Sequence, residues 1–369
     1  MTEIKNRSEL VFLYDVKDAN PNGDPLDSNK PRIDEETGIN IVTDVRLKRT
    51  VRDHIFNLIE NHEEKSSNSQ ATNKVREKIT SLVKGQDIFV REKPSDNEGH
   101  IQDAKLRAKD FIELTGKEEP EEKEIIERFK KGERIEKTQV EIIKNNISTN
   151  LKNKAVDIRL FGATVPLEFD SSEINGLDKN KSITSSITLT GPVQFRIGRS
   201  LHRVDVKHIK GTGAFASKPT ATQKTFREED VVSYSLINFY GIINENAAKH
   251  TKLTENDVTL LIDGIWNGTK NLISRSKAGQ LPRLLLKVEY KEKNYHIGDL
   301  DKLIKIKSKK RDEEIRDISD VELDISELIS ALNTNKDKIK SISKLVDYRT
   351  KIDFDGLDKS INLIDIILE

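Results

Sequence analysis

The sequence predicts an α+β fold with one large core, an inserted helical region and a protruding basic arm. Three observations lead to this prediction. Segments rich in β-branched and aromatic residues alternate with two amphipathic helices, a highly charged helical stretch interrupts them, and one Gly-containing segment concentrates positive charge. With the insert and the arm set aside, the order is strand, helix, strands, helix, strand, which is that of a ferredoxin-like unit, the architecture also used by RNA-recognition motifs.

The core elements follow from residue type and spacing. Strands are expected at 9–16, 231–243 and 283–290, and one long strand or two short ones at 183–197, where aliphatic, aromatic and β-branched residues concentrate. A helix is expected from Asp44 to near Glu60, with Thr43 as its N-cap and an apolar face at helical spacing made of Leu47, Val51, His54, Ile55 and Leu58. A second amphipathic helix is expected over 254–276, with an apolar side made of Val258, Leu261, Ile262, Ile265, Trp266 and Leu272.

Composition excludes several classes of protein. The chain has no cysteine, so disulfides, thiolate metal sites and cysteine nucleophiles are excluded. No window approaches the ~20 apolar residues of a membrane span. Residues 63–154 turn polar and then highly charged (EEPEEKEIIERFKKGERIEK), which predicts an inserted helical subdomain with solvated faces.

The arm at 196–224 reads RIGRSLHRVDVKHIKGTGAFASKPTATQK. It holds seven Lys or Arg residues against one acid, Asp205, in a chain whose 63 basic and 63 acidic residues cancel. A basic two-stranded arm with a Gly-containing tip and one aromatic residue, Phe215, suits the binding of a polyanion. The alternative is a solvated surface hairpin, and His202 and His208 are either base- or phosphate-binding residues or simple strand residues.

A second basic cluster lies on the first helix. Arg46, Lys48, Arg49 and Arg52 fall close together, and the last three share a stripe beside the apolar face. Such a helix can bury one side in the core and offer the next to phosphates, although an ordinary exposed face explains the cluster equally well when it is taken alone.

The acidic loop after the first strand raises the question of a metal. Residues 18–23 (DANPNG) match the start of a calcium-binding EF-hand loop, but Asn29 stands where the bidentate Glu is required. A magnesium-dependent nuclease could use Asp15, Asp18, Asp24 or Asp27. Local turn chemistry of Asp, Asn, Pro and Gly is the favoured explanation of this loop.

Three stretches together resemble a known family. They are NRSELVFLYDVKDANPNGDP, PRIDEETGINIVTDVRLKRTVRD, and ITLTGPVQFRIGRSL followed by the basic arm. The chain resembles the backbone subunit of CRISPR Cascade complexes (CRISPR-associated family seven), in its subtype I-B form. The resemblance is densest in residues 7–55 and 156–290, and it weakens in the helical insert and after Leu300.

This resemblance implies a RAMP-type fold. A modified RNA-recognition-motif palm would comprise residues 1–60, 155–195 and 229–300. An inserted fingers subdomain would occupy 61–154, a basic β-hairpin thumb would occupy 196–228, and a C-terminal region, 301–369, would pack on the palm.

The resemblance also implies a function. Copies of the chain would assemble head to tail along one CRISPR RNA in the cytoplasm and present it for pairing with target DNA. Their partners would be a large subunit, a guide-end-capping subunit and a guide-processing endonuclease, with no cofactor, no membrane and no catalysis by this chain. Type III relatives cut target RNA with an acidic residue in the first loop, where Asp24 is the nearest analogue. The alternatives are therefore a metal-dependent RNA endonuclease and a protein-assembly scaffold.

By position in the family pattern, Thr43, Lys48, Arg49 and Arg52 would contact guide phosphates, Asn20 and Asn22 would lie near the same RNA, and Phe215 is a candidate wedge. The complete expected RNA-binding set is Asn20, Asn22, Thr43, Arg46, Lys48, Arg49, Arg52, Arg196, Arg199, His202, Arg203, Lys207, Lys210, Phe215 and Lys218.

Overall fold

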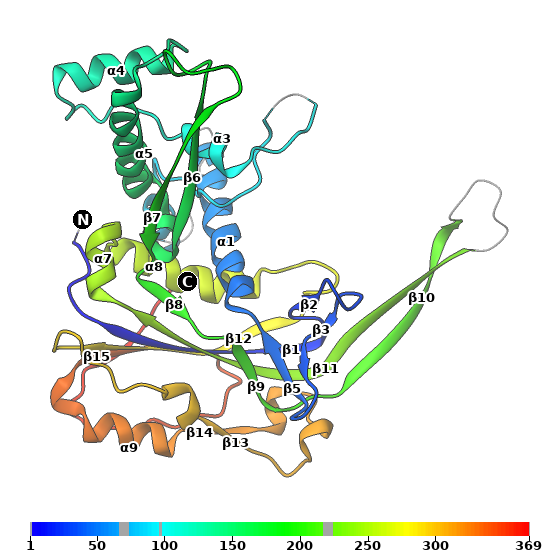
Figure 1. Cartoon of the computed structure of the whole chain (residues 1–369). Helices are drawn as coiled ribbons and strands as arrows, with labels where there is room; N and C mark the ends of the chain where they lie inside the picture. The colour runs from blue at the N-terminus through cyan, green and yellow to red at the C-terminus, as the bar shows by residue number, and fades with distance from the viewer. Residues whose placement is uncertain (1, 66–73, 96–97, 217–223, 369) are drawn as a thin grey trace. The chain divides into compact units, whose positions relative to one another are not determined.

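The computed structural model describes residues 2–65, 74–95, 98–216 and 224–368, without the side chains of 63–65, 212–216 and 224–227. The chain divides into two compact units (Figure 1). The first comprises Met1–Ile4, His54–Val193 and Glu245–Leu261, and the second comprises Lys5–Asp53, Gln194–Asn244 and Ile262–Glu369. Among the described residues, no helix is long and apolar enough to cross a membrane.

A large mixed sheet organises the second unit. Its strands run in the order β16-β15-β12-β1-β11-β9-β5-β4, and β10 and β8 also pair with β11. Their bounds are β1 Ser8–Ala19, β4 Ile33–Asp34, β5 Ile39–Val42, β8 Val193–Phe195, β9 Gly198–Arg203, β10 Val206–Ala216, β11 Lys224–Ile243, β12 Gln280–Tyr290, β15 Ile339–Val346 and β16 Leu363–Asp365. The central strand β1 is antiparallel to both neighbours, with Leu13 opposite Asn238 and Leu284.

The sequence of β1 explains its central place. Residues 8–16 are buried without alternation, which is the pattern of a strand covered on both faces. On one face, Phe12, Tyr14 and Phe239 stack in a row. On the other, Val11 and Leu13 belong to an apolar cluster that also takes in residues of the C-terminal region, including Leu300, Ile318, Leu323, Leu328 and Leu332.

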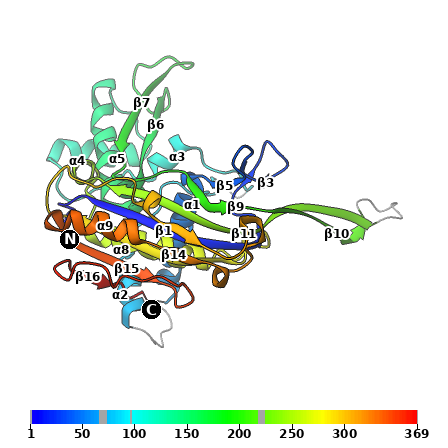
Figure 2. The ribbon, with the colours of Figure 1, turned by 90° about the horizontal axis from the view of Figure 1, so that it is seen from below.

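The C-terminal region therefore covers one face of this sheet. Seen from that side, α9 (Ser326–Thr334) and β14 (Glu322–Asp324) lie in front of β1 (Figure 2). The region contains η2 Leu300–Leu303, β13 Lys305–Lys307, η3 Asp312–Glu314, η4 Ile318–Asp320, β14 Glu322–Asp324, α9 Ser326–Thr334 and η5 Lys336–Lys338. Short strands β2 Gly23–Asp24 and β3 Lys30–Pro31 form a hairpin in the loop after β1.

The first unit is mainly helical. Its elements are α2 Lys74–Ser81, α3 Ala104–Lys109, α4 Pro120–Lys130, η1 Lys137–Gln139, α5 Val140–Lys154, α6 Val156–Phe161, α7 Glu245–Thr251 and the hairpin of β6 Gly162–Asp170 with β7 Ser182–Thr190. Two helices are shared between the units: α1 Asp44–Lys65 and α8 Glu255–Lys270. Gly162 joins α6 to β6 at φ 65°, where a Cβ atom would lie 2.1 Å from the carbonyl oxygen of Leu189, so only glycine fits.

The structure corrects three sequence-based boundaries. Residues 183–197, expected as one long core strand or two short ones, form two strands, of which 182–190 pair with β6 in a separate sheet and 193–195 pair with β11. Strand β9, predicted as part of the arm, instead belongs to the large sheet between β11 and β5. Gly198 makes this possible, because a Cβ atom there would lie 2.4 Å from the ring of Phe239. The second amphipathic helix ends at Lys270 rather than at 276.

Candidate nucleic-acid interface

The N-terminus of α1 is built by Thr43 and Asn22. The Thr43 hydroxyl accepts a hydrogen bond from the amide of Arg46 (3.3 Å), as an N-cap does. The Asn22 side-chain oxygen accepts from both the amide (2.8 Å) and the hydroxyl (2.9 Å) of Thr43. These two predicted site residues therefore hold the loop after β1 against the helix, and their polar groups are used inside the protein.

Asn20 connects the same loop to the segment that precedes β12. It is 3% exposed, its amide nitrogen donates to the carbonyl of Asn29 (2.6 Å), and its backbone amide donates to the carbonyl of Ser276 (2.8 Å). The Lys277 ammonium donates to the Asn20 carbonyl. The Oδ1 atom of Asn20 is buried and has no hydrogen-bond partner in the described structure.

Arg46 and Lys277 form a pair of like charges beside this loop. Burial and the nearby charge of Arg46 lower the pKa of Lys277 to about 8. Burial also lowers the pKa of Arg46. Within the described ranges, neither side chain forms an ion pair with a carboxylate. The charge of Asp53 acts on Arg46, but neither half-buried cation is neutralised by an ion pair, so an anion would stabilise the two.

The other predicted cations of α1 are already paired. Lys48 bonds Asp44 (2.9 Å) and Gln194 (3.3 Å), and its side chain is only 13% exposed. Arg49 pairs with Asp53 (2.9 Å) and stays largely exposed, while Arg52 is half-buried. Arg49 is therefore the best placed of these three to reach an external phosphate.

The basic arm is less positive than its sequence indicates, because acids from other segments face its described cations. Lys207 lies 3.6 Å from Asp18, Lys210 lies 3.2 Å from Glu228, and His208 bonds Asp230 (3.0 Å). The remaining pairs are Arg196 with Asp299, Arg199 with Asp34 (3.4 Å) and Arg203 with Glu313 (3.7 Å). Such exposed pairs contribute little stability each, so a phosphate can replace the acid at small cost.

The structure corrects the placement of His202, which was predicted to lie at the RNA surface. It is 2% exposed and stacks on Tyr234 with ring centres 5.7 Å apart. Its Nδ1 contacts the carbonyl of Arg203 (2.8 Å), and its Nε2 accepts from the amide of Leu236 (3.3 Å). Burial lowers the pKa of His202, which favours the neutral ring. The side chain of Phe215 and the whole of Lys218 lie outside the described residues.

Strands β10 and β11 form a hairpin that projects beyond the rest of its sheet (Figure 1). Val206, Lys207, His208, Ile209 and Lys210 are all exposed, so both faces of β10 are solvated there. A two-stranded ribbon without a covered face has marginal stability. Its direction therefore depends on how its base is attached.

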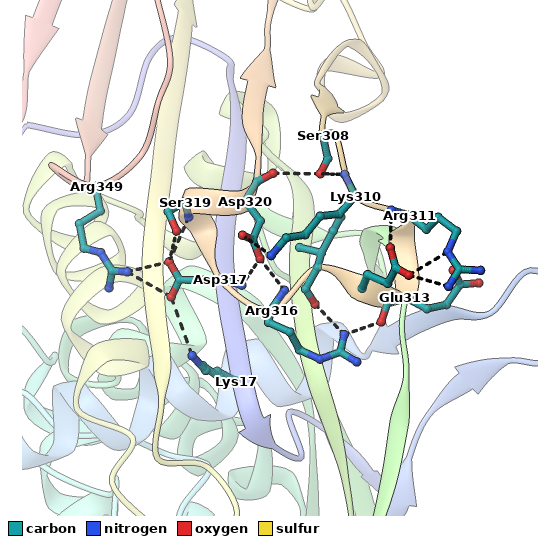
Figure 3. A network of polar contacts seen from close by, with 12 residues as sticks. Lys17, Ser308, Lys310, Arg311, Glu313, Arg316, Asp317, Ser319, Asp320 and Arg349 are labelled. Atoms are coloured by element: carbon teal, nitrogen blue, oxygen red, sulfur yellow. Dashed lines mark hydrogen bonds and ion pairs between the residues drawn. The ribbon is translucent and has the colours of Figure 1, made fainter.

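The C-terminal region holds that base. Asp205 accepts hydrogen bonds from the Ser233 hydroxyl (2.8 Å) and from Arg316 (3.2 Å). Arg316 also donates to the carbonyls of Glu313 and Ile315. A neighbouring acid, Asp317, bonds Arg349 (2.9 Å), with Lys17 of β1 at 4.0 Å, as Figure 3 shows.

Replacing Arg316 with alanine should loosen the hairpin without unfolding the second unit. The change removes the link between the C-terminal region and Asp205 and leaves the apolar cluster intact. We expect faster amide hydrogen exchange at 206–211 and 228–232 and a free energy of unfolding lowered by no more than about 1 kcal/mol. Arg311→Ala, which removes an exposed pair with Glu314, is the matched control. Unchanged exchange at the hairpin base would contradict this attachment.

The acids proposed for magnesium binding have other partners. Asp24 accepts from the amide of Leu26 (3.0 Å) and from Arg32 (2.9 Å), and Asp27 pairs with Lys30 (2.9 Å). Asp15 is buried against Arg283 at 2.8 Å. In the part of the chain that the structure describes, no group of three or more His, Asp or Glu residues could hold a metal ion.

Sequence reasoning missed Lys277. It lies in the turn SRSKAGQ between α8 and β12, where a single lysine carries no periodic signal. Only tertiary contacts bring it beside the loop after β1, namely its own bond to the Asn20 carbonyl and that of the Asn20 amide to Ser276.

Comparisons with known proteins place this chain in a family. The family model for CRISPR-associated protein Cas7 matches residues 6–326. The chain is 30% identical over 354 residues to a CRISPR-associated protein Cas7 of Haloferax volcanii, covering 94% of this chain and 89% of that one.

Two solved structures are also similar. One is a chain of a CRISPR RNA-guided surveillance complex, pre-nicking (TM-score 0.47, 13% identity, 98% of this chain and 97% of that chain). The other is a chain of a CRISPR RNA-guided surveillance complex (TM-score 0.46, 12% identity, 98% and 95%). The family match over most of the length and the 30% identity decide the assignment: this chain belongs to the Cas7 family of CRISPR-associated proteins.

Proposed function

We propose that this Cas7-family chain is the CRISPR RNA-binding backbone subunit of a type I Cascade complex, of subtype I-B. Copies polymerise along the guide in the cytoplasm, together with the other Cascade subunits, and present it for pairing with target DNA. The observation that supports RNA binding most directly is the pair of half-buried cations, Arg46 and Lys277, beside the N-terminus of α1, neither of which forms an ion pair in the described structure. The chain is proposed to bind RNA without cutting it, because Asp24, the candidate catalytic acid, is engaged in an ion pair with Arg32.

The topology supports a palm of the RNA-recognition-motif kind. In the order β12-β1-β11-β9, consecutive strands are antiparallel, and α1 and α8 fall between β1 and β9 and between β11 and β12 in the chain. This is the arrangement of a β-α-β-β-α-β unit. In RNA-recognition motifs, bases stack on the open sheet face. Here the C-terminal region covers one face, so we propose that RNA runs along the end of the sheet, past Asn20, Arg46 and Lys277.

This interface predicts a characteristic salt dependence. The double change Arg46→Ala, Lys277→Ala should weaken binding to all RNA sequences about equally and reduce the slope of log affinity against log salt by about two contacts. The control is Lys293→Ala, which removes an exposed lysine of the same unit. A slope that matches the wild type would remove these cations from the RNA site.

The same site predicts an unusual pH dependence. Free Lys277, with its pKa near 8, loses its proton well below the ordinary lysine value of ~10.4. Contact with a phosphate favours the charged form, so binding above pH 8 must take up a proton and RNA affinity should fall from about pH 8 upward. In Lys277→Arg this fall should vanish, because a guanidinium stays charged. Equal pH profiles for the two proteins would refute the contact.

A further inference from the structure

The first unit contains an open pocket of about 560 Å³, within the size range of small-ligand sites. It is lined by residues of α4, α5 and the loop 115–118. Ile126 and Ile142 provide an apolar floor, and the remaining walls are amides, hydroxyls and charged groups, with Lys252 contributed from the segment after α7.

On the pocket wall formed by α5, three polar side chains lie in a row, which we call the ladder. Asn145, Thr149 and Asn153 stand four residues apart, so they share one helix face. Among the described residues, none of their side chains has a hydrogen-bond partner. By contrast, the buried Asn146 and Asn150 both donate to the carbonyl of Glu113 (2.8 Å each), which fixes the loop opposite. Asn145 and Asn153 are exposed and Thr149 is half-buried, so all three side chains can reach a ligand in the pocket.

Positive charge gathers at one end of the ladder. Lys252 has φ 61°, a left-handed conformation that favours Gly or Asn at the end of a helix. Lys152 lies close to it, and burial together with the charge of Lys252 lowers the pKa of Lys152. Within the described ranges, neither these two nor the lining residue Lys117 forms an ion pair with an acid.

The pocket holds two acids of different character. Glu118 accepts four hydrogen bonds, from the amides of Thr115, Gly116 and Lys117 and from the Thr115 hydroxyl, and these hold its pKa at about 2. The Glu118 carboxylate therefore holds the loop 115–118 together through these hydrogen bonds. Glu122 is exposed, and its charge adds to that of Glu118 in opposing an incoming anion.

From this arrangement we propose that the pocket binds a nucleotide of a single-stranded nucleic acid, with its phosphate at Lys252 and Lys117 and its base edge on the Asn145–Asn153 ladder. The choice of nucleic acid as ligand rests on the proposed function. The site lies entirely in the first unit and is separate from the pair of Arg46 and Lys277. Guide RNA and the target DNA strand share this chemistry.

Two substitutions of opposite sign test the site in the full chain. Lys252→Gly removes a charge while suiting the left-handed backbone, so the fold should be kept and the salt slope for an oligouridine should fall by about 1. Glu122→Gln removes one of the two opposing charges and should raise affinity. Lys181→Ala, an exposed lysine on the β6–β7 turn, should change neither quantity. Photo-crosslinking should attach the strand to residues 145–153, with 4-thiouridine in RNA and 4-thiothymidine in DNA distinguishing the two sources.

The outcomes separate this site from the proposed function. If no crosslinks form at this pocket and its variants leave nucleic-acid affinity unchanged, while Arg46→Ala, Lys277→Ala still weakens RNA binding, the pocket proposal is wrong and the proposed function stands. If no variant at either site changes nucleic-acid affinity, the RNA-binding role itself fails. Crosslinks from either probe on α5, together with opposite shifts in Lys252→Gly and Glu122→Gln, would establish the pocket.

Discussion

Shortening the β10–β11 hairpin should abolish assembly along RNA while leaving a folded protein. In the structure, Gly211 pairs with Arg227, so residues 212–226 can be removed and these two joined through an Asn-Gly turn. The removed strand residues are the outermost part of a ribbon that projects beyond its sheet (Figure 1). We propose that this part grips the guide and reaches a neighbouring copy, so without it each copy binds RNA alone.

The core should tolerate this change because the base of the hairpin is attached independently. Asp205, Ser233 and Arg316 lie on the retained side, and the residues retained in β10 are exposed. We expect a melting temperature within a few degrees of the wild type, since the contacts that attach the hairpin base are kept. Sedimentation with a long CRISPR RNA should show isolated copies in place of arrays.

A matched control keeps the length of the hairpin and changes only its charge. Lys210→Ala removes one cation whose partner is Glu228, and it should lower RNA affinity slightly without preventing arrays. Full-length arrays from the shortened protein would show that the hairpin has no role in assembly.

Local features were predictable from the sequence, whereas charge balance was not. Helix α1 begins at Asp44 behind Thr43, as expected, because capping and apolar spacing act within a few residues. The positive charge of the arm was overestimated, because Asp18, Asp34 and Glu313 approach it from distant parts of the chain. His202 lies in a basic stretch, but the alternation of β9 places it on the buried side with Ser200.

The pair of Arg46 and Lys277 also depends on contacts that the sequence does not reveal. Arg46 was expected among several equivalent cations of α1, yet it differs from Lys48 because no acid lies one turn away to neutralise it in the described structure. Lys277 joins it only through tertiary contacts of its turn with Asn20. Pairing between β6 and β7 was likewise undetectable, because β-branched residues at 183–190 suit any sheet.

The largest loss of stability should follow the replacement of Arg283 by methionine. Arg283 is 2% exposed and bonds both Asp15 (2.8 Å) and Asp347 (2.6 Å), and Tyr234 donates to Asp15 (3.0 Å). The two ion pairs of Arg283 join β12 to β1 and to the segment that follows β15. Removing Arg283 leaves the Asp15 carboxylate buried without its cation, which typically costs about 3–5 kcal/mol. Chemical denaturation at pH 7 should show this loss.

The pH dependence of that loss distinguishes an uncompensated charge from a simple cavity. Burial already raises the pKa of Asp15 against the opposing effect of Arg283, so in Arg283→Met this pKa should rise further. A carboxyl group whose pKa is higher in the folded state favours folding when protonated, so stability should be lost as pH rises above the unfolded value of ~3.9. The deficit relative to wild type should therefore shrink between pH 7 and pH 5.

Adding Asp15→Asn should restore part of the stability, and Arg311→Met, at an exposed pair, should cost less than about 0.5 kcal/mol. A deficit that does not change with pH and is not relieved by Asp15→Asn would mean that Arg283 contributes packing rather than charge.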